Sequence, residues 1–168
     1  MKEDQKMNLG LANFWEVVCY DSNGAEKWRE ERKNLVTTVG LNHVLGSTCD
    51  AVTQVTAWYV GLKGAGAVAA GDTMASHSGW TEIADYSQSV RQTLTLGTAA
   101  AGSIDNTGNL ATYSINGTAT VAGAFIVSDN TKSGTAGTLY GVVDFSSSRA
   151  VISGDTLTVT VTLTAASA

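Results

Sequence analysis

The side chains with the most obvious chemical potential lie in one short polar segment. His77 is flanked by Ser76 and Ser78, and the carboxylates of Asp72 and Glu82 lie five residues before and after it. A serine, a histidine and an acid make up a hydrolase triad, but the fold assembles a triad, and sequence neighbours rarely do so. The G-x-S-x-G turn that exposes a nucleophilic serine does not occur in the sequence. We therefore interpret these residues as a loop whose polar side chains bond to its own backbone.

The imidazoles and thiols do not predict a metal centre. No pair among His43, His77, Cys19 and Cys49 has the spacing of zinc ligands. Because the two cysteines are far apart and outside any C-x-x-C motif, we expect reduced and buried thiols. His43 lies on the apolar stripe of a predicted helix, which favours a hydrogen-bonded histidine in the core. The expectation is a protein that is not an enzyme, with no catalytic residues, no cofactor and no metal.

Aromatic residues gather on both sides of this polar segment. Trp58, Trp80 and Tyr86 could together form an exposed platform for a sugar ring. Such residues more often pack in a core or a subunit contact, because each buries a large apolar area and keeps one polar group. We predict that they pack the loop. The two interpretations differ in the burial of the rings, because a sugar-binding platform must be exposed and packing residues are buried.

Arg91 is the cation nearest to this aromatic cluster. It follows Glu82 and Asp85 closely enough in sequence to pair with either of them, and it could also stack on Trp80. Both interpretations make Arg91 a structural residue that fastens the loop.

Size and composition restrict the classes of function. A chain of 168 residues is long enough for one domain with a substantial core. The net charge of −5 argues against general affinity for nucleic acid, which requires clustered lysine and arginine. No apolar run approaches the roughly 18 residues needed to span a bilayer, and no signal peptide is recognised, so no membrane association is expected. The sequence contains no proline, which leaves the edges of its β-strands unprotected by that residue.

The first 33 residues differ in charge density from the rest. Thirteen of the 25 charged side chains lie between Lys2 and Lys33. Residues 14–20 and 25–33 read as two strands joined by an Asn-Gly turn, the strongest short-range signal of a β-hairpin. Residues 1–12 show no period, and we expect a loose arm that a neighbour would order. We therefore divide the chain into an N-terminal arm with a charged hairpin, residues 1–33, and a body, residues 34–168.

The body reads as one helix followed by short strands. Asn34 is the predicted helix cap, the apolar stripe runs from Val36 to Val44, and Gly46 with Ser47 ends the helix. A buried strand is predicted over residues 54–62, and others near 91–97, 110–116, 118–127, 138–145 and 156–164. In the last strand threonine alternates with leucine and valine, which is typical of a half-buried antiparallel strand. This pattern predicts a mainly β fold, an antiparallel β-sandwich or jelly roll with one short helix and an N-terminal hairpin arm.

The order of motifs in the body resembles a family of small virion proteins of tailed bacteriophages. The motifs that carry the resemblance are Asn34-Leu35-Val36, Gly40-Leu41-Asn42, Trp58-Tyr59-Val60-Gly61-Leu62, the segment from Ala70 to Glu82, Tyr86, Arg91, Gly123-Ala124-Phe125, the segment from Thr131 to Gly134, and that from Gly137 to Tyr140. The resemblance covers about residues 34–164 and implies a non-enzymatic structural protein of the virion. Within that class it implies a capsid cement or decoration protein that binds the assembled shell of the major capsid protein. The alternatives are a protein of the tail, neck or fibre, and a module that binds host-surface carbohydrate weakly.

Physical considerations suggest where such a protein would make contact. A charged hairpin could reach a neighbouring subunit, and bare strand edges could pair between chains. We expect a homodimer or homotrimer, with interface residues Phe14, Trp15, Trp28, Arg29 and Arg32.

Overall fold

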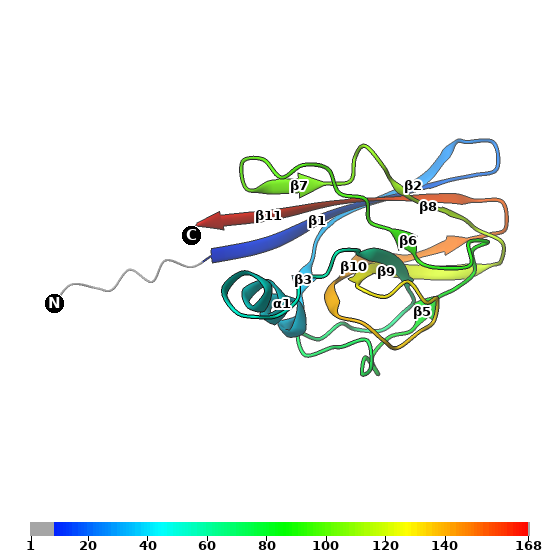
Figure 1. Ribbon diagram of the computed structural model, residues 1–168. Helices are drawn as coiled ribbons and strands as arrows, with labels where there is room; N and C mark the ends of the chain where they lie inside the picture. Colours follow the sequence, from blue (N-terminus) through cyan, green and yellow to red (C-terminus); the bar gives the residue numbers. More distant parts are fainter. Residues whose placement is uncertain (1–8, 168) are drawn as a thin grey trace.

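The computed structural model describes residues 9–167, which form a sandwich of two antiparallel β-sheets (Figure 1). The elements in chain order are β1 (Leu9–Tyr20), β2 (Glu26–Lys33), β3 (Leu35–Val36), α1 (Thr38–Cys49), β4 (Tyr59–Lys63), β5 (Glu82–Ile83), β6 (Gln92–Thr93), β7 (Ser103–Asp105), β8 (Ala111–Ser114), β9 (Ala119–Val127), β10 (Leu139–Val151) and β11 (Thr156–Ser167). Sheet A has the strand order β2-β1-β11-β7, and β8 also pairs with β11. Sheet B has the order β3-β10-β9-β4-β5, and β6 also pairs with β4. The predicted mainly β sandwich with one short helix is confirmed.

The turn of the N-terminal hairpin lies where the Asn-Gly signal places it. Gly24 has a φ of +82°, in the left-handed region that glycine adopts at no steric cost. The carboxylate of Asp21 accepts the backbone N–H groups of Asn23 and Ala25, at 2.8 and 2.9 Å. These two bonds hold the pKa of Asp21 below its ordinary value. Local turn chemistry therefore accounts for the hairpin.

The hairpin is nevertheless part of the sandwich and not a separate arm. Strand β1 pairs with β11 along its whole length, from Leu9 opposite Ser167 to Tyr20 opposite Thr156. It lies between β2 and β11 inside sheet A, so the division at residue 33 separates strands of one sheet. Residues 9–12, predicted as part of a loose arm, begin β1, while residues 1–8 of that predicted arm lie outside the described residues.

The main core lies between the two sheets. Along β11 the apolar residues Leu157, Val159 and Val161 are fully buried, while the threonines between them are half-buried and point to the outer face. This alternation is the predicted one, and β1 repeats it with Trp15 and Val17 facing inward. Cys19, also on this inner face, is fully buried, and burial raises its pKa to about 12. Cys49 is exposed, so the expectation of two buried thiols is wrong for that residue.

The helix begins and ends later than the sequence suggests. Its N-cap is Thr37, whose hydroxyl accepts the N–H of Gly40 at 3.1 Å, and its C-cap is Asp50. Asn34 cannot be the cap because the chain first forms β3, which pairs with β10. The predicted stripe does face the body, but Gly40 is the buried residue of the helix, and a Cβ there would lie 2.2 Å from the carbonyl oxygen of Tyr140.

Several strands differ in length from their predictions. The strand expected over residues 54–62 begins only at Tyr59, and β6 is reduced to Gln92–Thr93. Strand β10 is longer than expected, with a register shift between Asp144 and Arg149 in its pairing with β9. The short strands β3, β5 and β7 carry no pattern long enough to be recognised in the sequence.

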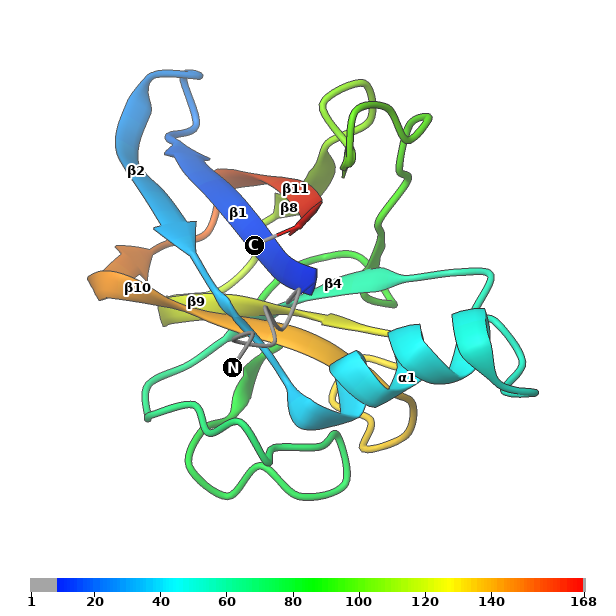
Figure 2. The same ribbon diagram turned by 90° about the vertical axis from the view of Figure 1, so that its left-hand side faces the viewer.

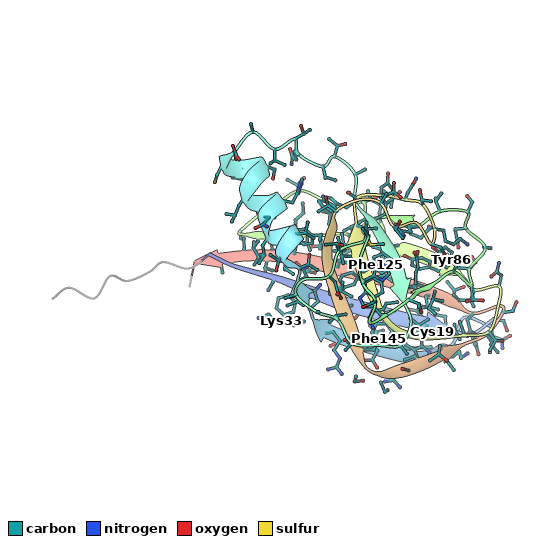
Figure 3. All side chains as sticks on the ribbon, turned by 90° about the horizontal axis from the view of Figure 1, so that it is seen from below. Cys19, Lys33, Tyr86, Phe125 and Phe145 are labelled. Carbon is teal, nitrogen blue, oxygen red and sulfur yellow. The ribbon has the colours of Figure 1, made fainter. Side chains whose placement is uncertain are left out.

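A third layer covers the outer face of sheet B. Residues 64–81, which we call the cover loop, cross that face together with the start of α1 (Figure 1, bottom; Figure 3). Met74 and Trp80 of the loop pack there against Phe125 of β9, and Val39 of α1 joins them. Figure 3 shows Phe125 among the strands beneath the loop, whereas Cys19 and Phe145 belong to the main core. Sheet B is therefore buried on both faces.

Candidate functional site

Arg91 is a fully buried cation that ties three segments together. Its Nε and Nη2 atoms donate to the two carboxylate oxygens of Glu82 at 3.0 and 2.7 Å. Nη1 donates to the carbonyl of Asp129 at 2.9 Å, and Nη2 also to that of Gly134 at 2.7 Å. The guanidinium lies 5.2 Å from the ring centroid of Phe125. A bidentate pair with further backbone acceptors satisfies a buried guanidinium, so Arg91 fastens the end of the cover loop to the β9–β10 connection.

Lys63 is a second fully buried cation, at the start of the cover loop. Its Nζ donates to the carbonyls of Gly64, at 3.0 Å, and of Gly66, and lies 2.7 Å from the carboxylate of Asp144. To reach Asp144 on β10 the side chain crosses β9 at Gly123, where a Cβ would lie 3.2 Å from its Cδ. The ammonium group thus has three acceptors for its three protons. Both ends of the cover loop are held by buried cations.

The middle of the cover loop is organised around Trp80. Its Nε1 donates to the carboxylate of Asp72 at 2.9 Å, and its ring stacks on the imidazole of His77 with centroids 4.0 Å apart. The other contacts of the ring include Phe125, at a centroid distance of 5.2 Å. His77 Nδ1 lies 3.1 Å from the Trp80 carbonyl oxygen. Aromatic packing and hydrogen bonds of this kind fix the loop in one conformation.

The residues that resembled a hydrolase cluster therefore have structural partners. The Asp72 carboxylate bonds the indole of Trp80, Glu82 is engaged by Arg91, and His77 is bound to a backbone carbonyl. The N–H of Ser76 closes a turn of the loop on the Thr73 hydroxyl. Within residues 9–167 no group of three His, Cys, Asp or Glu side chains is arranged to hold a metal ion. The arrangement supports a loop that bonds to itself.

Burial of the rings excludes the alternative of a sugar-binding platform. Trp80 is 3% exposed and Tyr86 is 1% exposed, so neither face can receive a ligand. Trp58 is half-buried and makes edge contacts with His43 and Tyr140. An aromatic platform built from these three rings is therefore not available.

Tyr86 is held in the interior by other side chains. Its ring meets that of Tyr113 edge to face at 5.0 Å, and the Nζ of Lys132 lies 4.1 Å from its centroid. Burial raises the pKa of Tyr86 well above its ordinary value, and the negative charge of Glu82 raises it further. Tyr86 is thus neutral in the folded protein and belongs to the packing of the loop end.

A buried carboxylate joins the two sheets at the edge formed by β2. Glu30 is 4% exposed and accepts hydrogen bonds from the N–H and hydroxyl of Ser146 and from the guanidinium of Arg149. Burial alone would raise its pKa, but these bonds outweigh that effect and lower it. The Nε of Arg32 also lies 3.6 Å from its carboxylate. Strand β2 is therefore fixed to β10 through charge.

The outer face of sheet A, in contrast, has no described element over it (Figures 1 and 2). The β1–β2 turn and the loop next to β7 rise on either side of it (Figure 2). Half-buried threonines of β11 line the face, and Phe14 stands among them with 47% of its surface exposed. A groove of about 350 Å³ runs beside Phe14, lined also by Glu16, Glu31 and Lys33. Exposed apolar surface next to paired charges is typical of a contact surface.

The five predicted interface residues divide between this face and the interior. Phe14 and Arg29 lie on the outer face, where Arg29 is paired with Glu16 and with Glu26 of β2. Trp15 is 3% exposed and belongs to the core, so it cannot be an interface residue. Trp28 is half-buried against Phe145, and Arg32, on the same side of β2 as Trp28, is partly exposed and also lines the groove. The strand alternation that places Phe14 outside thus places Trp15 inside.

Three features were missed in the sequence. Lys63 follows a buried apolar strand and precedes the Gly64-Ala65-Gly66 turn whose carbonyls it binds, but no short-range pattern indicates Asp144 as its partner. The burial of Glu30 could have been inferred, because it alternates in phase with Trp28 on β2. The groove beside Phe14 forms only where β1 pairs with β2 and β11, and the sequence does not specify that pairing.

Comparison with models of known protein families finds no match to this chain. A search among curated proteins finds no relative at a significant level of similarity. Of the helices in the described residues, none is long and apolar enough to cross a membrane.

Proposed function

We propose that this chain is a non-enzymatic structural protein of a bacteriophage virion, and most specifically a decoration protein that cements the assembled capsid shell. Its location would then be the virion, after assembly in the host cytoplasm. The family resemblance of residues 34–164 motivates the class. The observation that supports a contact surface is the uncovered outer face of sheet A, where the exposed side chain of Phe14 lies beside a groove.

The internal use of the reactive groups supports the same proposal. Internal ion pairs and hydrogen bonds that fix the cover loop and the two sheets already engage the charged groups of Arg91, Lys63 and Glu30. What remains on the surface of sheet A is hydroxyl groups, paired charges and one large apolar ring. Such a surface is suited to recognition of another protein surface, in which a buried aromatic side chain contributes a large part of the binding energy.

The mechanism would be stabilisation by preferential binding. A protein that binds the assembled lattice and not the free subunits lowers the free energy of the assembled state by mass action. Many copies, or a homodimer or homotrimer that binds at several points, would add avidity to individually weak contacts. The partner in this mechanism is the shell of the major capsid protein, and no cofactor takes part.

The test measures binding of the purified protein to preformed, undecorated shells of the cognate major capsid protein. We expect binding by co-sedimentation and a higher melting temperature of the shell. Phe14→Asp should weaken binding by about tenfold or more, because it places a charge at a desolvated contact. Ile152→Asp is the matched control, since Ile152 is 52% exposed and lies outside sheet A's outer face, and it should bind normally.

The sequence alone suggests a simpler test, deletion of residues 1–33, but this deletion removes β1 from the middle of sheet A and would unfold the protein. Absence of binding to shells, together with recovery of the protein in isolated tails, would overturn the cement role and favour the tail alternative. Equal binding by Phe14→Asp and wild-type protein would exclude the proposed contact surface.

A further inference from the structure

The dipeptide Asn-Gly occurs twice in the sequence, at Asn23-Gly24 and at Asn116-Gly117. Glycine has no Cβ to shield its backbone nitrogen, so this nitrogen can reach the side-chain amide of the asparagine before it. Attack on the amide carbon closes a five-membered succinimide ring and releases ammonia. Both asparagines are exposed, so access to water does not distinguish the two sites. The structure distinguishes them by what holds each backbone in place.

The Asn23-Gly24 site lies in the β1–β2 turn, which projects from the sandwich (Figure 2). A Cβ at Gly24 would meet no atom within 4 Å. The Gly24 N–H donates to the carbonyl of Asp21 at 3.0 Å, and this bond must open before the nitrogen can attack. The other hydrogen bonds that shape the turn also connect Asp21 with Asn23 or Ala25. An exposed turn held by local bonds can open while the strands behind it stay paired, at a small cost in free energy.

The Asn116-Gly117 site is fastened to two other segments of the chain. The Asn116 N–H donates to the carbonyl of Asp85 at 3.2 Å, and a Cβ at Gly117 would lie 2.7 Å from a carboxylate oxygen of Asp85. The N–H of the preceding residue, Ile115, donates to the carbonyl of Asp155 at 2.9 Å. Rotation of this backbone toward a ring would therefore break contacts between segments distant in sequence. Opening here costs more free energy than opening of the β1–β2 turn.

We propose that Asn23 is a site of spontaneous deamidation in the folded protein and that Asn116 is protected by its contacts. The Gly24 nitrogen, after loss of its proton, forms a bond to Cγ of Asn23, and the Cγ–Nδ2 bond breaks. The leaving amino group takes up a proton and departs as ammonia. Water then opens the ring at either of its two carbonyl carbons and leaves an aspartate or an isoaspartate. The product carries one negative charge more than the net −5 of the unmodified chain.

The test follows the intact mass of the purified full-length chain during incubation at mildly alkaline pH, with peptide mapping to locate the change. We expect a gain of about 1 Da at Asn23, because a hydroxyl group replaces an amino group. In water enriched in oxygen-18 the gain should be about 3 Da, since the new oxygen comes from the solvent. The conversion should be faster at higher pH, because the attacking species is the deprotonated nitrogen. We expect Asn23 to convert about tenfold or more faster than Asn116.

Asn23→Ser removes the reacting amide and keeps a residue that favours turns, so the mass gain should disappear. Asn116→Ser is the matched control and should convert at the wild-type rate.

The same incubation in guanidinium chloride separates the effect of the fold from that of the neighbouring residues. Both sites should convert at similar rates in the unfolded chain, and a slow Asn116 there would overturn the protective role of its contacts. Equal rates at the two sites of the folded protein overturn the proposal, and so does a folded chain in which Asn23 stays intact while the unfolded chain converts. Shell binding plays no part in this measurement, so its result is independent of the proposed function.

Discussion

The outer faces of the two sheets differ in whether the chain covers them. On sheet B the cover loop and the start of α1 bury Phe125 and its neighbours completely, and buried cations hold both ends of the loop. On sheet A the corresponding face remains open, lined with threonine hydroxyls and by Phe14. The same architecture thus produces one face closed by its own chain and one left for contacts with other molecules.

The difference lies in what each face contains. The outer face of sheet B is apolar and needs a cover, since bare apolar surface of that extent would aggregate. The outer face of β11 offers threonines, whose hydroxyl groups remain hydrated while their branched side chains favour strand structure. Polar alternation therefore allows sheet A to stay open, and continuous apolar character requires a third layer over sheet B.

The strongest test of this comparison removes one arginine from each face. Arg91→Met should lower the free energy of unfolding by about 3–5 kcal/mol, because it leaves Glu82 as an unpaired buried carboxylate. Arg29→Met, the matched change on the open face, breaks exposed ion pairs and should leave stability nearly unchanged. Urea unfolding followed by tryptophan fluorescence measures both. Equal losses would mean that the closed face is no more dependent on its cation than the open one.

A second test addresses the backbone of the cover loop. Gly66 has a φ of +112°, and a Cβ there would lie 1.6 Å from the carbonyl oxygen of Gly79. Gly66→Ala should therefore lower stability by about 2 kcal/mol or more, through strain and overpacking. Gly71→Ala in the same loop is the control, because a Cβ at Gly71 meets no atom within 4 Å. Thermal melting of the two variants should differ clearly, and a shared small shift would contradict a tightly packed loop.

The smallest expected effect concerns the edge where the two sheets meet. Because the pKa of Glu30 is lower in the folded protein than its ordinary value of 4.5, its contribution to stability is complete above that value. The contribution is lost as pH falls through the lower folded pKa, when the carboxylate takes up a proton. Urea midpoints between pH 7 and pH 3 should fall more steeply for wild type than for Glu30→Gln. Parallel curves would show that Glu30 does not contribute to acid sensitivity.

The open face could largely be predicted from the sequence, and the closed face could not. The alternation of threonine with leucine and valine in β11 and the Asn23-Gly24 turn are local patterns, and both have the expected structure. The cover depends on contacts between residues distant in sequence, such as Lys63 with Asp144, which no local period encodes. Phe14 and Trp15 are adjacent aromatic residues, and only the alternation of β1 decides that Phe14 is exposed and Trp15 is buried.

The pairing of Leu9 with Ser167 has a consequence for how the chain can be rearranged. The first and last described strands are neighbours in sheet A, and the start of β1 and the end of β11 both lie at the pole of α1 (Figure 1). The start of the first described strand and the end of the last one are therefore adjacent in space. A circular permutant that joins the ends through a short linker and opens the chain between Asn23 and Gly24 would keep every strand beside its present neighbours. A cargo attached ahead of β1 and one attached after β11 would both be joined to the sandwich at this pole.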